Sequence, residues 1–153
     1  LVGSEMCIRD RYQTVRAARP MDVGFGQSVR LGGASPSPGT TATAGSTIPV
    51  TLLWRTSSPL RVNYSVSVQL LGPDGRLAGQ SDGQPQGGAA PATTWRTTET
   101  VPDTHELEIP AGAQAGTYTL GVALYDLATL QRLPVAGQAD GLARVATLDV
   151  VRQ

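Results

Sequence analysis

Few side chains of this 153-residue chain could carry out acid–base or nucleophilic chemistry. His105 is the single histidine, and one histidine cannot build a multi-histidine metal site. No serine lies in a Gly-x-Ser-x-Gly elbow, and only His105 could act as the base that a serine nucleophile needs. We interpret His105 as a solvated residue on an edge strand. The sequence therefore predicts no catalytic residue, no metal site and no cofactor.

Two carboxylates have positions that suit ligand binding. Asp82 and Asp103 flank a long loop and the strand that returns from it. Carboxylate oxygens can bind a sugar hydroxyl or Ca²⁺, but the Asp-x-Asp-x-Asp spacing of a calcium loop is missing from the sequence. Asp74 and Asp126 instead lie in predicted turns, where Asp is expected for structural reasons. The two flanking carboxylates are therefore candidates for contact with a sugar.

Trp95 ends the Gly-, Pro- and Gln-rich loop 82–94 and lies outside any alternating strand. An exposed Trp beside polar residues can stack on a sugar ring, with Asp82 and Asp103 as partners of the sugar hydroxyls. A loop Trp can also plug the open end of a β-sandwich. Both interpretations of Trp95 remain open. Trp54 and Tyr64, in contrast, have the register of core residues.

These candidate residues must be positioned by β-strands, and the clearest strand is the stretch 114–126. Large apolar side chains alternate there with small or polar ones, which predicts a half-buried strand. The run Gly116-Thr-Tyr-Thr-Leu120 fits the tyrosine corner of immunoglobulin-like β-sandwiches, with Leu120 at the position of the second cysteine of an antibody domain. The large apolar residues that we expect to be buried from this strand are Tyr118, Leu120, Val122 and Leu124.

Other alternating stretches predict further strands, separated by turns rich in Gly, Pro, Ser and Thr. The turn Gly72-Pro-Asp-Gly75 predicts a hairpin, and the segment 35–45 is expected to be a loop. The predicted strands are 28–34, 47–55, 63–71, 76–81, 98–109 and 143–151, with a short extension at 131–135. The remaining core residues are expected to be Val29, Leu31, Val50, Leu52, Trp54, Val66, Val68, Leu70, Leu107 and Ile109.

Two prolines and the alternation in the last strand give expectations for single positions. Pro49 suits the start or the edge of its strand, and Pro102 suits an edge or a bulge. In the last strand we expect Val145 and Thr147 to share one face with either Asp149 or Val151. The sequence thus predicts an all-β, immunoglobulin-like antiparallel β-sandwich of about seven to eight strands in residues 28–153, preceded by a linker at 12–27.

The overall charge excludes some partners. The chain has 12 basic and 12 acidic residues and no net charge at pH 7, so it offers no excess positive charge for nucleic acid or an anionic membrane surface. No apolar run approaches the roughly 20 residues of a membrane-spanning helix. Cys7 is the only cysteine, so an internal disulfide is impossible, and this leaves the compartment open because bacterial exported domains and cytosolic domains can both lack disulfides.

Residues 1–11 have a different character from the rest of the chain. Their run Glu5-Met-Cys-Ile-Arg-Asp-Arg11 resembles the translation of a transposase-type sequencing adapter. A segment of this origin would not belong to the folded domain, so it is left out of the predicted strands. We therefore expect residues 1–11 to be non-native, and we expect more protein to have preceded Tyr12 in the natural polypeptide.

Short runs of the region 50–133 carry a resemblance to a known family: Leu53–Arg55, Val68–Gly75, Asp82–Pro85, Thr94–Trp95, Asp103, Gly116–Tyr118, Gly121–Asp126 and Arg132–Leu133. Together they resemble the β-sandwich domain that follows the membrane-embedded part of bacterial, Chloroflexota-like glycosyltransferases of the dolichyl-phosphate-mannose type. Where that family often has a Thr-Gly turn after Tyr-Asp, this chain has Ala-Thr-Leu130. The resemblance implies an extracytoplasmic accessory domain without catalytic residues of its own.

Three functional hypotheses follow. The leading one is a non-catalytic accessory domain at the C-terminal end of a truncated, membrane-anchored glycosyltransferase-like protein, acting through contact with a glycan or a neighbouring domain. The alternative is a carbohydrate-binding module that uses Trp95, Asp82 and Asp103. A glycoside hydrolase ranks below both, because no paired, loop-borne carboxylates are evident. A β-sandwich hosts many functions, so the fold alone does not choose among them.

Overall fold

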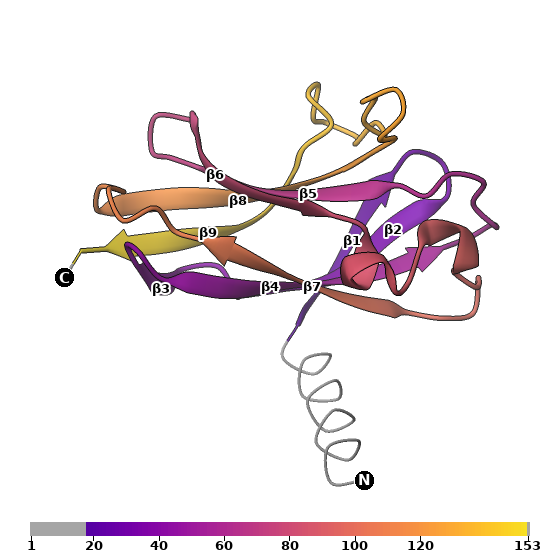
Figure 1. The fold of residues 1–153 in the computed structure, drawn as a ribbon, viewed down its shortest axis with the longest axis horizontal. Helices are drawn as coiled ribbons and strands as arrows, with labels where there is room; N and C mark the ends of the chain where they lie inside the picture. Colours follow the sequence, from indigo (N-terminus) through magenta and orange to yellow (C-terminus); the bar gives the residue numbers. More distant parts are fainter. Residues whose placement is uncertain (1–17, 153) are drawn as a thin grey trace, which may run out of the picture.

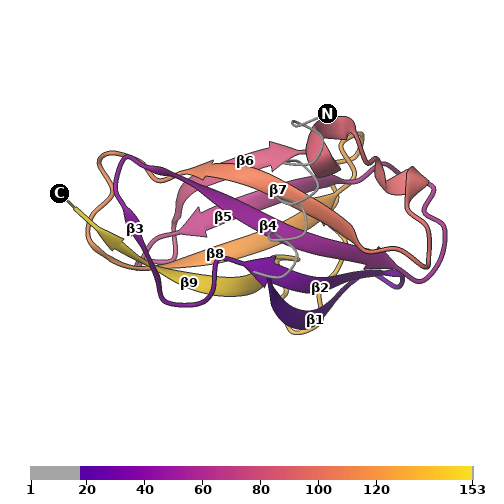
Figure 2. The ribbon, with the colours of Figure 1, turned by 90° about the horizontal axis from the view of Figure 1, so that it is seen from below.

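The computed structural model describes residues 18–152, which form two β-sheets packed face to face (Figures 1 and 2). One sheet has the order β1-β2-β4-β7 and the other the order β3-β9-β8-β5-β6. Two short 3₁₀ turns, η1 (Pro85–Gly88) and η2 (Ala92–Thr94), lie between β6 and β7. The strands are β1 (Arg19–Phe25), β2 (Val29–Ser35), β3 (Thr40–Thr43), β4 (Thr47–Thr56), β5 (Ser65–Leu71), β6 (Leu77–Gly83), β7 (Val101–Glu108), β8 (Gly116–Tyr125) and β9 (Ala143–Val151).

The core between the sheets is the one that the alternating pattern predicts. In β8, Tyr118 is 4% exposed and Leu120 is fully buried. The predicted core positions of β2, β4, β5 and β7 are buried as well, because alternate side chains of a strand point to the same face. The confirmed core residues are Val29, Leu31, Val50, Leu52, Trp54, Val66, Val68, Leu70, Leu107, Ile109, Val122 and Leu124.

Two further features confirm the immunoglobulin-like architecture. The Tyr118 hydroxyl donates a hydrogen bond of 2.8 Å to the Gln114 carbonyl four residues upstream, as in a tyrosine corner. The chain also passes from one sheet to the other between β2 and β3, so that β2 pairs with β4 while β3 pairs with β9. The short connection between Ser35 and Thr40 therefore links the two sheets.

The domain begins earlier than the sequence predicts. The predicted linker 12–27 contains β1, which pairs with β2 in antiparallel orientation, so the boundary at residue 28 was wrong. Phe25 explains the pairing: it is fully buried, and its ring meets Trp54 edge-on with centroids 5.3 Å apart. The predicted non-native segment 1–11 lies outside the described residues.

The predicted loop 35–45 also contains a strand. β3 is four residues long and runs parallel to β9 at the edge of the five-stranded sheet. Only Ala42 of β3 is buried, so the segment has no apolar alternation by which the sequence could predict it. The described part of the chain therefore has nine strands and one parallel pairing, rather than seven or eight antiparallel strands.

The predicted face of the last strand was wrong. Leu148 and Val150 are buried, whereas Asp149 and Val151 are exposed and Thr147 is intermediate. The register of β8 and β9 shifts next to Val145, and a bulge of this kind moves all later side chains to the opposite face.

Two prolines lie where a strand can accept them. β2 pairs with β4 only from Thr51 onward, so Pro49 lies beyond the end of β2. Pro102 lies in β7, which is one of the two edge strands of its sheet. Both placements confirm the expectation that proline marks strand starts and edges.

Candidate functional site

Trp95 is a core plug. Its side chain is 5% exposed and is stacked on Trp54, with ring centroids 6.1 Å apart and an interplanar angle of 21°. Its indole Nε1 donates a hydrogen bond of 2.9 Å to the Ala90 carbonyl. Because the ring face is already covered, Trp95 cannot serve as the exposed platform on which a sugar would stack.

Asp103 is also buried, with no exposed surface. Its Oδ2 atom accepts a hydrogen bond from Trp54 Nε1 at 3.1 Å and lies 2.6 Å from His105 Nε2. Its Oδ1 atom accepts a hydrogen bond of 2.7 Å from the Gln86 amide in η1. Asp103 therefore fastens the loop after β6 to the core. Asp103 and Trp95 both contact Trp54. These two candidate residues therefore lie near each other, but inside the β-sandwich and not on its surface.

The interpretation of His105 as a solvated residue was wrong. β7 is an edge strand, but His105 is only 7% exposed. It shares the inward face of β7 with Asp103 and Leu107, and a strand of period two buries every second side chain.

Asp82 lies apart from these residues, on the outer face of the five-stranded sheet. Its Oδ1 atom accepts hydrogen bonds from the Ser67 hydroxyl at 2.8 Å and from Gln80 Nε2 at 3.2 Å. Its Oδ2 atom accepts one from the Tyr125 hydroxyl at 3.1 Å. Asp82 is itself exposed, so of the three candidate site residues only this one meets solvent.

These groups surround a surface hollow of about 240 Å³, which we call the Asp82 hollow. Its walls come from β5, β6, the end of β8 and the segment that follows β8. Ser67 and Gln69 are 3% and 9% exposed although they face outward from the sheet. The lining residues are Ser67, Gln69, Gln80, Asp82, Tyr125, Leu130 and Arg132.

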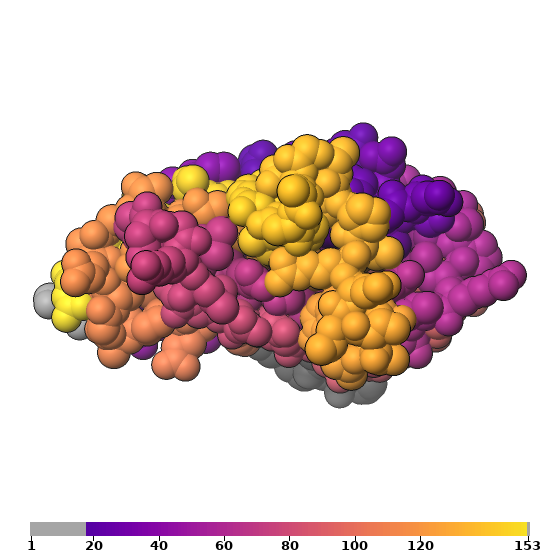
Figure 3. All heavy atoms as spheres, turned by 90° about the horizontal axis from the view of Figure 1, so that it is seen from above, coloured from indigo at the N-terminus to yellow at the C-terminus, as the bar shows by residue number. Residues whose placement is uncertain are grey.

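The segment 126–142 builds one wall of the Asp82 hollow. It turns at Asp126, whose carboxylate accepts a hydrogen bond of 2.9 Å from the Ala128 amide, and this confirms the predicted structural role of Asp126. The chain then returns beside Tyr125, where Arg132 forms an isolated bridge with it. In Figure 3 the orange and yellow segment stands out as a raised mass on this side of the molecule.

The segment 126–142 is held down where it ends. Leu142 is 2% exposed and lies over Gly121 of β8. A Cβ atom at Gly121 would stand 2.7 Å from the Leu142 side chain, closer than two carbon atoms can approach. Glycine at this position therefore allows the segment to lie against the sheet.

Leu130 has an unusual backbone conformation in this turn. Its φ of 61° lies in the left-handed region, which costs a residue other than glycine about 1–2 kcal/mol. Its side chain is 70% exposed at the rim of the Asp82 hollow. A leucine thus adopts here a backbone conformation that usually favours glycine.

Two sets of charges shape the surroundings of the hollow. Burial raises the pKa of Tyr125 above its ordinary value of 10.0, and the neighbouring Asp82 carboxylate raises it further. The Arg144 guanidinium beside Asp140 lowers the pKa of that carboxyl, with an ion-pair distance of 2.9 Å. Because the pKa of Tyr125 is raised, its phenol is neutral at physiological pH and donates a hydrogen bond to Asp82.

The Asp82 hollow can bind polar groups. Three donors occupy the Asp82 carboxylate, which has about four acceptor sites. No described residue donates to Gln69 Oε1, whose amide nitrogen donates to Ser67. Arg132 uses one nitrogen to reach the Asp140 carbonyl at 3.0 Å and has further N–H donors.

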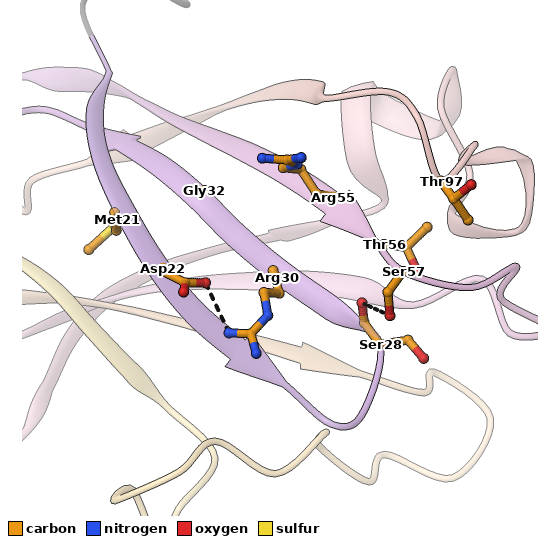
Figure 4. A pocket seen from close by; sticks show the side chains of 9 residues that line it. All are labelled: Met21, Asp22, Ser28, Arg30, Gly32, Arg55, Thr56, Ser57 and Thr97. Atoms are coloured by element: carbon orange, nitrogen blue, oxygen red, sulfur yellow. Dashed lines mark hydrogen bonds and ion pairs between the residues drawn. The ribbon is translucent and has the colours of Figure 1, made fainter.

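A larger hollow of about 470 Å³ lies on the outer face of the four-stranded sheet (Figure 4). Asp22 and Arg30 form an ion pair of 2.9 Å there, with side chains 76% and 59% exposed. Arg55, from β4, lines the same hollow (Figure 4). Because these charges are largely exposed, water solvates them, and an exposed pair of this kind contributes little energy. We take the Asp82 hollow as the candidate site, because its lining includes the largely buried polar side chains of Ser67 and Gln69 beside the exposed carboxylate of Asp82.

Sequence reasoning found Asp82 but missed the rest of the hollow. The alternation of Ser65, Ser67 and Gln69 indicates an outward polar face, but the partners across the hairpin depend on register. Leu71 pairs with Leu77, whereas Gln69 pairs with Gln80, because the register shifts between Leu70 and Leu71. Counting from the turn without this bulge would place Gln80 on the wrong face.

Within residues 18–152 there is no group of three or more His, Cys, Asp or Glu side chains that could hold a metal ion. In the same residues no helix has the length and the apolar character needed to cross a bilayer.

No family model and no curated protein matches this sequence. Among solved structures, the CARDB domain of a protein from Pyrococcus furiosus, crystallised in complex with di-metal ions, is similar with a TM-score of 0.43 and 12% sequence identity. The match covers 86% of this chain and 96% of that chain. The evidence for the immunoglobulin-like fold class is the order of the strands in the two sheets and the tyrosine corner.

Proposed function

We propose that this chain is a non-catalytic accessory β-sandwich domain, which acts by contact with a glycan or with a neighbouring domain of the same polypeptide. The observation that carries this proposal is the burial of His105, the one imidazole of the chain. His105 lies against Asp103, which also bonds Trp54 and the Gln86 amide. A general base must come within hydrogen-bond reach of the substrate proton, and this pair instead fastens a loop.

The exposed polar groups favour binding over catalysis. At the Asp82 hollow one carboxylate is surrounded by hydroxyl and amide donors. A glycoside hydrolase of the usual kind needs a second carboxyl group about 5–10 Å from the first. The residues that line the hollow include no second carboxylate, which supports a role in contact with a ligand.

The context that we propose is the C-terminal, extracytoplasmic part of a membrane-anchored glycosyltransferase-like protein. Its support is the resemblance of the region 50–133, including the Gly116–Tyr118 and Gly121–Asp126 runs. In such a protein the transfer chemistry would belong to the region upstream of this domain. Sequencing the natural gene upstream of the Tyr12 codon tests this context: a region encoding several membrane-spanning helices supports it, and a soluble catalytic domain contradicts it.

The absence of catalysis is tested with the purified 153-residue chain. We expect no hydrolysis of a panel of chromogenic α- and β-glycosides above the rate of a heat-denatured sample. An Asp82→Asn variant is measured in parallel. Hydrolysis by the wild-type chain that disappears in Asp82→Asn would make the domain an enzyme and overturn the proposal.

A further inference from the structure

We infer that the Asp82 hollow is a binding site for a single ring of a neutral saccharide, and this inference rests on the proposed role of the domain in contact with a ligand. Three observations carry it: sequestered polar groups on the outer face of the sheet, an apolar side chain held in a strained conformation at the rim, and the size of the hollow. None of them involves Trp95.

The polar groups of the hollow match the hydroxyl groups of a sugar. Each sugar hydroxyl both donates and accepts hydrogen bonds, so neighbouring hydroxyls need donors and acceptors side by side. Asp82 and Gln69 Oε1 offer acceptor positions, while Arg132 offers donors. One carboxylate and one guanidinium give the lining no net charge, which favours a neutral ligand.

These polar groups are held in place before a ligand arrives. The hydrogen bonds of Asp82 come from three different positions, on β5, β6 and β8. Ser67 and Gln69 are largely buried and are linked to each other by a hydrogen bond of 3.2 Å. Preorganisation of this kind reduces the entropy lost when a ligand binds.

Leu130 and Tyr125 provide apolar surface beside the polar groups. Leu130 holds a left-handed conformation that costs stability, while its side chain is 70% exposed and gains little from burial. Strain that packing does not explain often marks a functional position. A leucine at this rim offers contact to the C–H groups of a sugar ring.

The size of the hollow limits the ligand. Sites for drug-sized ligands measure about 300–1,000 Å³, whereas this hollow measures about 240 Å³. It can therefore hold one ring, such as the terminal residue of a glycan, while further residues of the glycan would extend into solvent.

The test is a glycan array followed by isothermal titration calorimetry with the 153-residue chain. The probes are neutral glycans that end in mannose, glucose, galactose or N-acetylglucosamine, with a glycan ending in sialic acid for comparison. We expect saturable binding of at least one neutral glycan and no binding of the sialylated one. Asp82→Asn should weaken binding about tenfold or more, because a hydrogen bond to a charged group is lost.

Leu130→Gly separates binding from folding. Glycine adopts the left-handed conformation without steric cost, so the melting temperature should stay the same or rise. Affinity should nevertheless fall about fivefold, since the apolar rim is removed. Asp22→Asn is the matched control, because it removes an exposed carboxylate from β1, an edge strand of the other sheet. The affinity of this variant should equal that of the wild type.

Each outcome decides the inference. Absence of binding to every neutral glycan overturns it, and so does binding that Asp82→Asn and Leu130→Gly leave unchanged. Loss of affinity in Asp22→Asn to the same extent would place binding elsewhere and overturn it as well. None of these results would show catalysis, so the non-catalytic role would stand; only hydrolysis of a glycoside contradicts that role.

Discussion

The hydroxyl of Tyr125 reports directly on the Asp82 hollow, because its pKa depends on both burial and the Asp82 carboxylate. We expect Tyr125 to ionise above the ordinary pKa of 10.0. The raised pKa of Tyr125 contributes stability that is fully present below about pH 10 and is lost as the pH rises through the folded-state pKa. A spectrophotometric titration near 295 nm, with Tyr125→Phe subtracted, measures this.

The same titration tests the contribution of Asp82. Burial is the largest cause of the raised pKa of Tyr125, and the Asp82 charge is the second. In Asp82→Asn the pKa of Tyr125 should therefore fall but remain above 10.0. An unchanged pKa in this variant would show that the bond of 3.1 Å between the two side chains does not persist in solution.

Trp95 has a structural role, and its removal should affect stability. Trp95→Ala removes a ring that is stacked on Trp54 and 5% exposed. Removing a buried Trp typically costs about 3–5 kcal/mol, so the urea midpoint should fall sharply. Trp95→Phe should lose less, because it keeps part of the ring packing. A midpoint equal to that of the wild type would mean that Trp95 is exposed in solution and could contact a sugar after all.

At the scale of elements, the packing of the end of the segment 126–142 against β8 depends on Gly121. Gly121→Ala places a Cβ atom 2.7 Å from the Leu142 side chain, so this buried side chain, at the end of the segment, must shift. Overpacking usually costs about 1–3 kcal/mol, and we expect faster amide hydrogen exchange in 127–142 than in the wild type. Glycan affinity should fall too, because Arg132 belongs to this segment.

Gly83→Ala is the matched control for this change. Gly83 also lies in a strand of the five-stranded sheet, but an added Cβ there meets no atom within 4 Å. Its exchange rates in 127–142 should match those of the wild type. Equal protection of 127–142 in both variants would show that Leu142 does not anchor the segment.

At the scale of the whole molecule, the β-sandwich depends on the apolar layer between its sheets. Leu120→Asp puts a charge at a fully buried position of β8, where no partner is available and ionisation is costly. We expect the chain to be unfolded at 25 °C, as measured by circular dichroism and near-ultraviolet fluorescence. Thr119→Asp, one residue away on the opposite face, should remain folded; a folded Leu120→Asp variant would contradict the register of β8.

The sequence by itself was sufficient to predict which residues form the core. The alternation from Tyr118 to Leu124 and the tyrosine corner are local patterns, and a strand of period two translates them into one buried face. The segments that lack such a pattern were mispredicted. β3 has only Ala42 buried, and β1 is explained by the contact of Phe25 with Trp54, which is distant in sequence.

Only the tertiary structure decided where the candidate site lies. Trp95 was open to two interpretations until the stacking on Trp54 showed that the loop closes over the core. The Asp82 hollow requires a bulge near Leu71 that sets the hairpin register, and it requires a segment lying over Gly121. Both depend on contacts between residues far apart in the chain, and a local alternation of side chains contains no information about such contacts.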